Sequence, residues 1–248
     1  MGRMTETVKV LLITNVLFYI GTLTIGDTAY RLFSLWFFEN ENFGAWQFVT
    51  HMFMHGGFTH ILFNMYALWA FGSPIEQVLG RKKFIFFYFS AGIGAALIHT
   101  LVNYYQFQSG FQALLGAGLD PESIWRILET GQYNTGILSG TITNELLADF
   151  YGSVNTPAVG ASGAIYGILV AFGMTFPNVQ LFLLFVPIPI KAKYFIPALI
   201  GIDLISGFSG YSLFGGGIAH FAHVGGALFG FIMMWYWKKN SFNDNRWY

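Results

Sequence analysis

The spacing of charged residues restricts the folds open to this chain more than any other feature. Charge-free stretches run from Lys9 to Asp27, from Glu41 to Glu76, from Lys83 to Asp120 and from Asp149 to Lys191. Apolar runs of roughly 18 or more residues are typical of membrane-spanning helices. Only 10% of the chain is charged, whereas an ordinary soluble domain has about 25% charged residues. The sequence therefore predicts a polytopic integral membrane protein.

Six spans are expected within a single membrane domain, residues 1–248. The segments that are long and apolar enough lie at about 8–26, 58–79, 84–106, 161–178, 194–210 and 217–237. We therefore expect an all-α fold, a bundle of six transmembrane helices. The first segment is long enough to span and has no obvious cleavage site, which favours a retained helix over a signal peptide. Residues 179–191 are short and rich in proline, so we expect an interfacial connector there.

Basic residues indicate the orientation of these spans. Lys and Arg gather before the first span, between the second and third, before the fifth and after the last. Cytoplasmic loops carry an excess of Lys and Arg, so both termini are expected to face the cytoplasm. The outward loops are then residues 27–57 and an insert, residues 107–158. Within the insert, "DPESIWRILETG" and "TNELLADFYG" predict two short surface helices, the first capped by Asp120.

Composition also limits the partners. The formal net charge is zero and no basic block is present, which argues against a nucleic-acid partner. The chain has no cysteine, so disulfides and thiolate metal sites are excluded. Membrane lipids are the expected surroundings, and no feature calls for a cofactor or a metal.

Polar residues at membrane depth are costly unless they are paired, so they are candidates for function. His60 and Asn64 are four residues apart and share one face of the second predicted helix. Ser162 begins the fourth predicted helix, and His223 lies near the outer end of the sixth. The predicted topology places all four at one depth, a little below the outer surface. A serine becomes a nucleophile when a neighbouring base takes its proton, and imidazole is the usual base.

Small residues suggest how Ser162 and His223 could meet. Gly163 and Gly167 form one small-xxx-small pair, and Gly226 and Gly230 form another. Such pairs allow two helix backbones to approach closely. A crossing of the fourth and sixth helices through these glycines would bring Ser162 within hydrogen-bonding reach of His223. Gly225, about 100° around the sixth helix, is expected to tolerate a larger side chain better.

Other interpretations of these polar residues stay open at this stage. A serine between small residues in a membrane helix is often a packing residue. His51 and His55 are four apart and could be metal ligands, which with His60 would suggest a metal or proton transporter, although no carboxylate or cysteine nearby completes a site. Asp203 is expected to be a structural acid bonded to a neighbouring helix, without a chemical role.

Three segments carry a resemblance to a known family. They are "HILFNMYALWAFGSPIEQVLG" (60–80), "GASGAIYG" (160–167) and "AHVGGALFG" (222–230). In this order they resemble the HxxxN, GxSG and AHxxGxxxG motifs of the rhomboid intramembrane serine proteases, of the bacterial six-helix type. The resemblance covers about residues 45–105 and 159–237. The chain departs from the family in having Trp46-Gln47, where Trp-Arg is frequent, and in the long insert 107–158.

The resemblance implies a role for each matching residue. Ser162 corresponds to the nucleophile and His223 to the general base of a dyad that lacks an aspartate. His60 and Asn64 correspond to residues that stabilise the oxyanion, and Tyr166 to the tyrosine packed on the catalytic histidine. Gly226 and Gly230 correspond to the close-packing glycines, and Gly160 and Gly163 are supporting residues beside Ser162.

The same resemblance implies the activity and its substrates. It implies an endopeptidase that cleaves single-pass membrane proteins at or near a helix-weakened site by the outer leaflet. A bacterial inner (cell) membrane is the expected location. The alternatives are a catalytically inactive rhomboid-like protein that binds membrane clients and the transporter described above.

Overall fold

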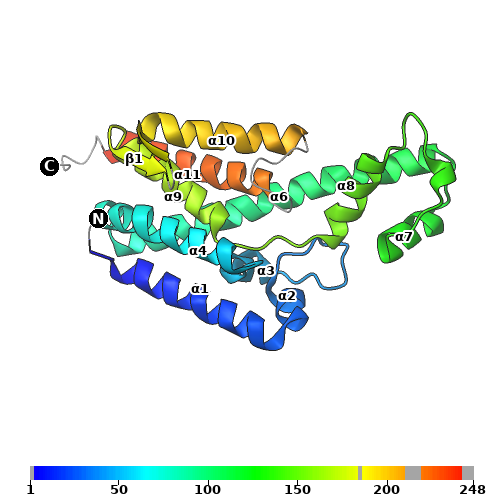
Figure 1. Ribbon diagram of the computed structural model, residues 1–248, viewed down its shortest axis with the longest axis horizontal. Coiled ribbons are helices and arrows are strands. Elements are labelled where there is room, and N and C mark those ends of the chain that lie inside the picture. Colours follow the sequence, from blue (N-terminus) through cyan, green and yellow to red (C-terminus); the bar gives the residue numbers. More distant parts are fainter. Residues whose placement is uncertain (1–2, 184–185, 210–218, 242–248) are drawn as a thin grey trace.

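The computed structural model describes residues 3–183, 186–209 and 219–241. Parts of two predicted spans, residue 210 and residues 217–218, lie outside the described residues, as do residues 1–2, 184–185 and 242–248. The described chain is mostly helical, with long helices running side by side (Figure 1). The beginning of α1 and the end of α11 lie at the same end of the molecule (Figure 1).

Helix α1 (Glu6–Ile25) begins where a buried carboxylate meets its N-terminus. Glu76 of α5 (Ser73–Leu79) accepts a hydrogen bond from the Thr5 hydroxyl and from the backbone N–H groups of Thr7 (3.2 Å) and Val8 (3.1 Å). The first N–H groups of a helix have no acceptor within the helix, and the helix dipole favours negative charge there. Glu76 therefore ties the start of α1 to the end of the second predicted span.

The second predicted span is built from three consecutive helical elements. It consists of α4 (Phe58–Ala67), a π-helical turn η2 (Leu68–Gly72) and α5, with no break in the run of helical residues. Before it, the loop between the first and second predicted spans, which is the first predicted outward loop, folds into α2 (Asp27–Phe33), α3 (Gln47–Thr50) and the short 3₁₀ turn η1 (His51–Phe53). The second predicted span is therefore one continuous helical segment made of three elements, each shorter than a span.

Gln47 holds this first loop together. Its side chain is fully buried, and its Nε2 donates to the backbone oxygens of Asn42 (2.8 Å) and Arg31 (3.1 Å). Its Oε1 accepts from the N–H of Trp36 at 3.2 Å. A buried amide with partners on both sides fixes the segments that it joins. Gln47 thus anchors the loop at the position where the family often has arginine.

Helix α6 (Arg81–Gly116) is longer than the sequence predicts. It has 36 residues, so residues 107–116, which were expected to begin the outward loop, continue the helix of the third span. Residue 106 is a glutamine, so neither glycine nor proline stops the helix there. Gly110, one turn further on, packs against Phe150 and stays helical. The projecting end of α6 carries the rest of the insert (Figure 1).

The two predicted surface helices of the insert are confirmed. Helix α7 (Pro121–Thr130) is capped by Asp120, whose side chain accepts from the N–H of Ser123 at 3.0 Å, and it ends at Gly131 in the left-handed conformation. The Asp120 pKa is held below its usual range by these bonds to Ser123. Helix α8 (Asn144–Asn155) is capped by Thr143. A second apolar cluster, separate from the main core, holds both helices to α6 and includes Phe107, Leu114, Ile124 and Phe150.

The fourth, fifth and sixth predicted spans correspond to α9 (Ser162–Thr175), α10 (Ala192–Ser209) and α11 (His220–Ser241). The expectation of an all-α fold is wrong in one place, because β1 (Gln180–Leu183) and β2 (Val186–Lys191) pair as an antiparallel hairpin between α9 and α10. The sequence has prolines at 187 and 189, and proline disfavours the interior of a helix.

Three helices of the described part are long and apolar enough to cross a membrane, namely α1, α6 and α10. α9 is apolar but has only 14 residues, and the second predicted span is divided between three elements. The chain is a helical membrane bundle, and the count of six spans stays a prediction. α9 lies in the main core, packed between α6, α11 and η2.

Candidate active site

Ser162 is the first residue of α9, and Gly160 sets the turn that leads to it. Gly160 has a φ of +121°, a conformation that L side chains rarely adopt. A Cβ at this position would also lie 2.8 Å from Nε2 of His60. The Gly160 N–H donates to the His51 carbonyl at 2.9 Å, which fixes the turn to the first outward loop. Glycine is therefore required at position 160, two residues before the serine.

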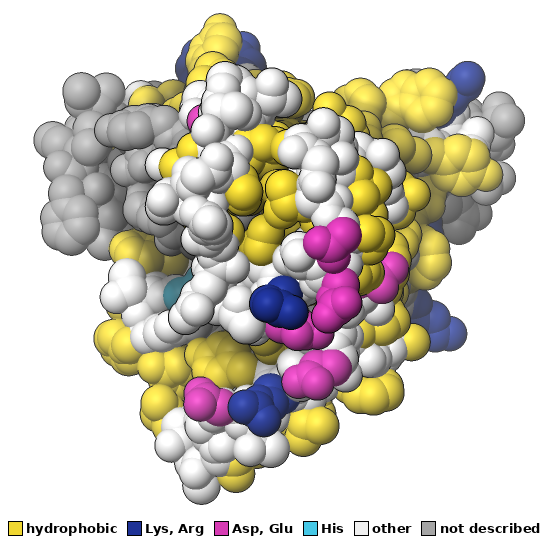
Figure 2. Space-filling view, turned by 90° about the vertical axis from the view of Figure 1, so that its right-hand side faces the viewer, with side chains coloured by type: hydrophobic (Ala, Val, Ile, Leu, Met, Phe, Trp, Pro, Cys, Tyr) yellow, Lys and Arg dark blue, Asp and Glu magenta, His cyan; other side chains and the backbone are white. Residues whose placement is uncertain are grey.

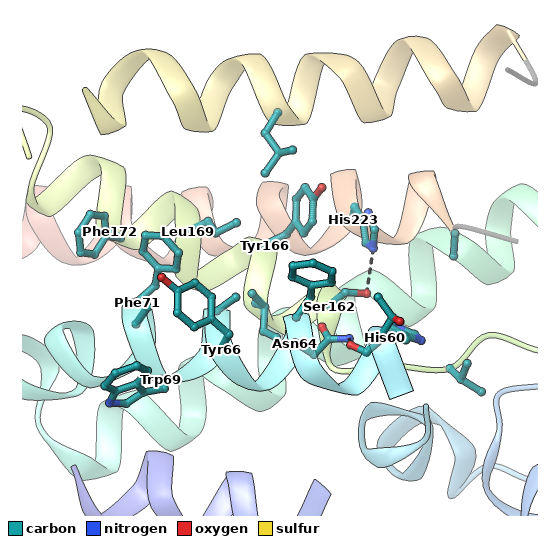
Figure 3. A pocket seen from close by; sticks show the side chains of 18 of the residues that line it. His60, Asn64, Tyr66, Trp69, Phe71, Ser162, Tyr166, Leu169, Phe172 and His223 are labelled. Atoms are coloured by element: carbon teal, nitrogen blue, oxygen red, sulfur yellow. Dashed lines mark hydrogen bonds between the residues drawn. The ribbon is translucent and has the colours of Figure 1, made fainter. Parts of the chain in front are cut away.

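His223 of α11 reaches Ser162 directly. Its Nε2 lies 2.8 Å from the Ser162 Oγ, within hydrogen-bonding distance (Figure 3). The ring of Tyr166, one helical turn after Ser162, stacks on the imidazole with centroids 4.2 Å apart and planes 12° apart. The structure thus brings together the three residues that the sequence places on two distant helices.

The glycine pairs make this approach possible. A Cβ on Gly226 would overlap the carbonyl oxygen of Gly163, and a Cβ on Gly230 would lie 2.6 Å from the Cα of Gly167. The backbones of α9 and α11 are therefore in contact at both pairs, as the small-xxx-small pattern predicts. Gly225 is also crowded, because its Cβ would lie 2.7 Å from the Ile98 Cβ of α6. Its nearest neighbour is a side-chain atom at a longer distance than the backbone oxygen that Gly226 would overlap, so the expectation that Gly225 is the more tolerant position stays a prediction. α11 is packed between two helices, so both faces are crowded.

Asp203 of α10 is bonded to neighbouring helices, as the sequence predicts, and its partners include the candidate base. Its carboxylate accepts hydrogen bonds from the Tyr166 hydroxyl, from His220 Nδ1 at 2.5 Å and from His223 Nδ1 at 3.1 Å. It is 5% exposed. One feature of the sequence marked Asp203 as unusual, because it is the one charged residue between Lys193 and Lys238. Its partners could not be read from that feature.

His60 and Asn64 lie on the α4 side of Ser162 (Figure 3). The N–H of Gly56 donates to His60 Nδ1 at 3.3 Å, so Nε2 of a neutral His60 ring carries the proton. Nε2 is the nitrogen that faces Gly160, beside the serine. The Asn64 Nδ2 donates to the His60 carbonyl at 3.0 Å, one turn back on the same helix. One donor on the ring and one on the amide are thus held near Ser162.

A cavity of about 1570 Å³ opens at this site. Five of the predicted site residues line it: His60, Asn64, Ser162, Tyr166 and His223. The rest of its wall is largely apolar, with Phe63 and Tyr66 of α4, Leu169 and Phe172 of α9, and Phe195 and Leu199 of α10. The polar side chains are gathered at one end of this apolar space (Figure 3). A mostly apolar cavity with a few convergent polar groups is the usual form of a binding site.

His51 and His55 are buried and do not form the metal site considered above. His51 Nδ1 lies 2.8 Å from the Gln47 carbonyl, and His55 Nδ1 lies 3.3 Å from that of Phe53. Among the residues that the structure describes, one group of histidines and acids has ligand atoms within 4.8 Å of one another, and it is Asp203, His220 and His223. The atoms of that group already hydrogen-bond to each other.

Acidic side chains gather at the far end of the insert (Figure 2). The exposed ones on or beside α7 and α8 are Asp120, Glu122, Glu129, Glu145 and Asp149, accompanied by Arg126. This end lies opposite the end where α1 begins and α11 finishes (Figure 1).

The fold and the site together define a polytopic helical membrane protein with a serine and a histidine hydrogen-bonded inside the bundle. A model of the rhomboid domain matches residues 42–118 and 122–240. This match covers most of the chain, and the chain belongs to the rhomboid family.

Curated relatives agree with this assignment. The presenilin-associated rhomboid-like protein, mitochondrial, of Bos taurus is 30% identical over 185 residues, which are 74% of this chain and 35% of the relative. Rhomboid protein 1, mitochondrial, of Saccharomyces cerevisiae is 26% identical over 75% of this chain and 40% of its own length. Rhomboid protease GlpG of Salmonella choleraesuis is 38% identical over 77 residues, 31% of this chain and 28% of the relative.

These relatives bear on length and location. The chain spans between a third and two fifths of the length of the two mitochondrial relatives. Their names place them in mitochondria, which does not fit the expectation of a bacterial inner membrane. What the family and the apolar helices show is an integral membrane protein.

Proposed function

We propose that this protein is an intramembrane serine endopeptidase that cleaves single-pass membrane proteins. The observation that carries the proposal is the 2.8 Å hydrogen bond between the Ser162 Oγ and His223 Nε2 at the polar end of the cavity. Nucleophile and base within hydrogen-bonding reach are the signature of covalent catalysis by serine. The name of one relative, a rhomboid protease, agrees with the same chemistry.

In the proposed reaction, His223 Nε2 takes the Ser162 proton as Oγ attacks the carbonyl carbon of the scissile bond. The same nitrogen then gives the proton to the leaving amine, and an acyl-enzyme remains on Ser162. Water, activated by His223, releases the second product. Negative charge on the carbonyl oxygen is stabilised by His60 Nε2–H, by the Asn64 amide and by backbone N–H groups in the first turn of α9, which have no acceptor within the helix.

The cavity suggests how a substrate binds. Its walls come from α4, α9 and α10, and outside the cavity wall α4 and α10 expose Leu62, Ile205 and Phe208, as lipid-facing surfaces do. A segment of a transmembrane helix could enter between these helices from the lipid. The segment must unwind locally, because the carbonyls of a helix are occupied by its own hydrogen bonds. A site weakened by small or helix-breaking residues, near the outer leaflet, meets that requirement.

The proposed topology has one membrane domain of six spans, with both termini in the cytoplasm and the insert outside. α9 completes a span although it is short, because it lies in the core of the bundle rather than against lipid. The opposite placement of basic ends and acidic insert supports this orientation (Figure 1, Figure 2). The same arrangement suits a bacterial cell membrane or an organelle membrane. In an organelle, the termini would face the matrix and the insert would face the opposite side of the membrane.

The competing functions are an inactive, client-binding rhomboid and a transporter. An inactive member is disfavoured because Ser162 and His223 are both present and bonded to each other. A metal transporter is disfavoured because His51 and His55 are engaged with backbone carbonyls.

Labelling with a fluorophosphonate probe, which reacts with activated serines, tests the proposal. The purified protein should be labelled and should cleave a single-pass substrate reconstituted with it, and Ser162→Ala and His223→Ala should each lose both activities. Because the two residues act as one unit, the double variant should be no worse than either single one. Ser90→Ala, on α6 outside the cavity wall, is the control and should behave as the parent.

Two results would contradict the proposal. Substrate turnover by well-purified Ser162→Ala protein would exclude Ser162 as the nucleophile. Loss of proteolysis on adding a chelator, with recovery on adding zinc, would favour a metal site instead.

A further inference from the structure

The bundle contains a buried carboxylate that the proposed dyad does not use. Asp203 is 5% exposed, and its oxygens accept bonds from three side chains on two other helices. A carboxylate placed among apolar helices costs free energy unless it is paired, so its retention needs a reason. Tethering α10 to the bundle is one reason, and it would be met by the bonds to Tyr166 and His220 alone. The bond to His223 is not needed for a tether.

We propose that Asp203 is a positioning residue for His223 and that the chain therefore uses a Ser162–His223–Asp203 arrangement. This inference rests on the proposed protease function. A carboxylate oxygen only accepts hydrogen bonds, so the bond at 3.1 Å requires the proton of a neutral His223 ring to be on Nδ1. Nε2 is then unprotonated, and Nε2 is the atom 2.8 Å from the Ser162 Oγ. Asp203 thereby selects the one tautomer that can act as a base toward the serine.

The same carboxylate also fixes the ring in space. Tyr166 stacks on the imidazole and donates a hydrogen bond from its hydroxyl to Asp203, so one side chain holds both the ring and the carboxylate. His220 donates to the same oxygen as His223 at 2.5 Å and prevents the carboxylate from turning away. During proton transfer the carboxylate faces the imidazolium that forms, and it stabilises this charge without taking the proton itself.

The test compares two isosteric replacements of buried carboxylates. In Asp203→Asn, the amide nitrogen can donate to Nδ1 and so favours the wrong tautomer of His223. In soluble proteases with a Ser-His-Asp triad the same change lowers kcat by about 10⁴. We expect kcat to fall by about 10² to 10⁴ with a much smaller change in KM. Glu76→Gln is the matched control, since Glu76 also accepts three hydrogen bonds but lies at the start of α1, outside the cavity wall.

The control separates positioning from stability. Glu76→Gln should lower the unfolding temperature and leave kcat close to the parent value. A purely structural Asp203 would give the same pattern, and unchanged kcat in Asp203→Asn would overturn the proposal. Fluorophosphonate labelling of the parent protein, lost in Ser162→Ala, shows independently that the protease proposal holds. Failure of Asp203→Asn to lower kcat would then count against the positioning role alone.

A second measurement needs no change at Asp203. In protein labelled with ¹⁵N-histidine, the nitrogen spectrum distinguishes the two neutral tautomers, and the His223 signals are those missing from His223→Ala. We expect Nδ1 to be the protonated nitrogen at a pH where the ring is neutral. A spectrum showing Nε2–H for His223 would overturn the proposal even if Asp203→Asn does not fold.

Discussion

Replacement of Gly226 by alanine tests the close crossing of α9 and α11. The added methyl group would overlap the carbonyl oxygen of Gly163 and would lie 2.7 Å from its carbonyl carbon and 3.1 Å from its Cα. These are backbone atoms, so no change of rotamer relieves the overlap. The distance to the carbonyl carbon must grow from 2.7 Å to at least 3.4 Å, the lower limit of ordinary contact. The helices must therefore separate beside Ser162.

The size of the effect follows from that separation. Gly163 directly follows Ser162, and Gly226 is three residues after His223, so the shift acts on the bond between Oγ and Nε2. Misplacement of catalytic groups by about 1 Å costs around 10²-fold in rate. We expect kcat/KM for Gly226→Ala to fall by about 10². Overpacking typically costs about 1–3 kcal/mol, so the unfolding temperature should also fall.

The assay is cleavage of a purified single-pass substrate in detergent and in vesicles, with the unfolding temperature measured on the same samples. Gly21→Ala is the control, because no atom lies within 4 Å of the Cβ that it would introduce on α1. It should match the parent protein in both measurements. Gly225 cannot serve as the control, since it packs against Ile98. If Gly226→Ala cleaves the substrate at the parent rate, the backbone contact is not what holds Ser162 to His223.

Two further predictions concern the oxyanion donors and the topology. His60→Ala should lower kcat by about 10² to 10³, the usual cost of losing one oxyanion donor. Asn64→Ala should lower kcat less, because the Asn64 amide is partly engaged with the His60 carbonyl. Turnover at the parent rate in both variants would mean that these residues only pack. An epitope tag beside Gly136, on the exposed 3₁₀ turn η3 (Thr135–Ile137) of the insert, should bind antibody added to intact cells. Binding only after permeabilisation would reverse the orientation and the depth assigned to the active site.

Local patterns in the sequence were sufficient for the membrane class and for much of the secondary structure. Charge-free runs indicate where lipid surrounds the chain, since charge is costly there. Caps and stops are equally local, and Asp120, Pro121 and Gly131 delimit α7 where the sequence predicts it. The two glycine pairs also identified the helices that touch, because glycines at a four-residue spacing in a membrane helix mainly allow a second helix backbone to approach closely.

The sequence was insufficient where an element depends on its neighbours. Nothing in residues 107–116 reveals that α6 continues, because the helix there is stabilised by packing of Phe107 and Leu114 against the insert. The hairpin of β1 and β2 was missed for a related reason. Its hydrogen bonds join residues on different strands, and the sequence of a short proline-containing segment does not indicate which segment it pairs with.

For the site, the sequence by itself determined which residues are available and the tertiary structure decided which atoms meet. Ser162 and His223 were identifiable from their motifs, but they are 61 residues apart, and their 2.8 Å bond exists only because α9 and α11 cross through glycine. Asp203 shows the difference most clearly. From the sequence it is one acid in an apolar helix. The rotation of α10 about its axis turns that acid toward Tyr166 and His223, and such a rotation is set by side-chain packing between helices, which no local pattern in the chain encodes.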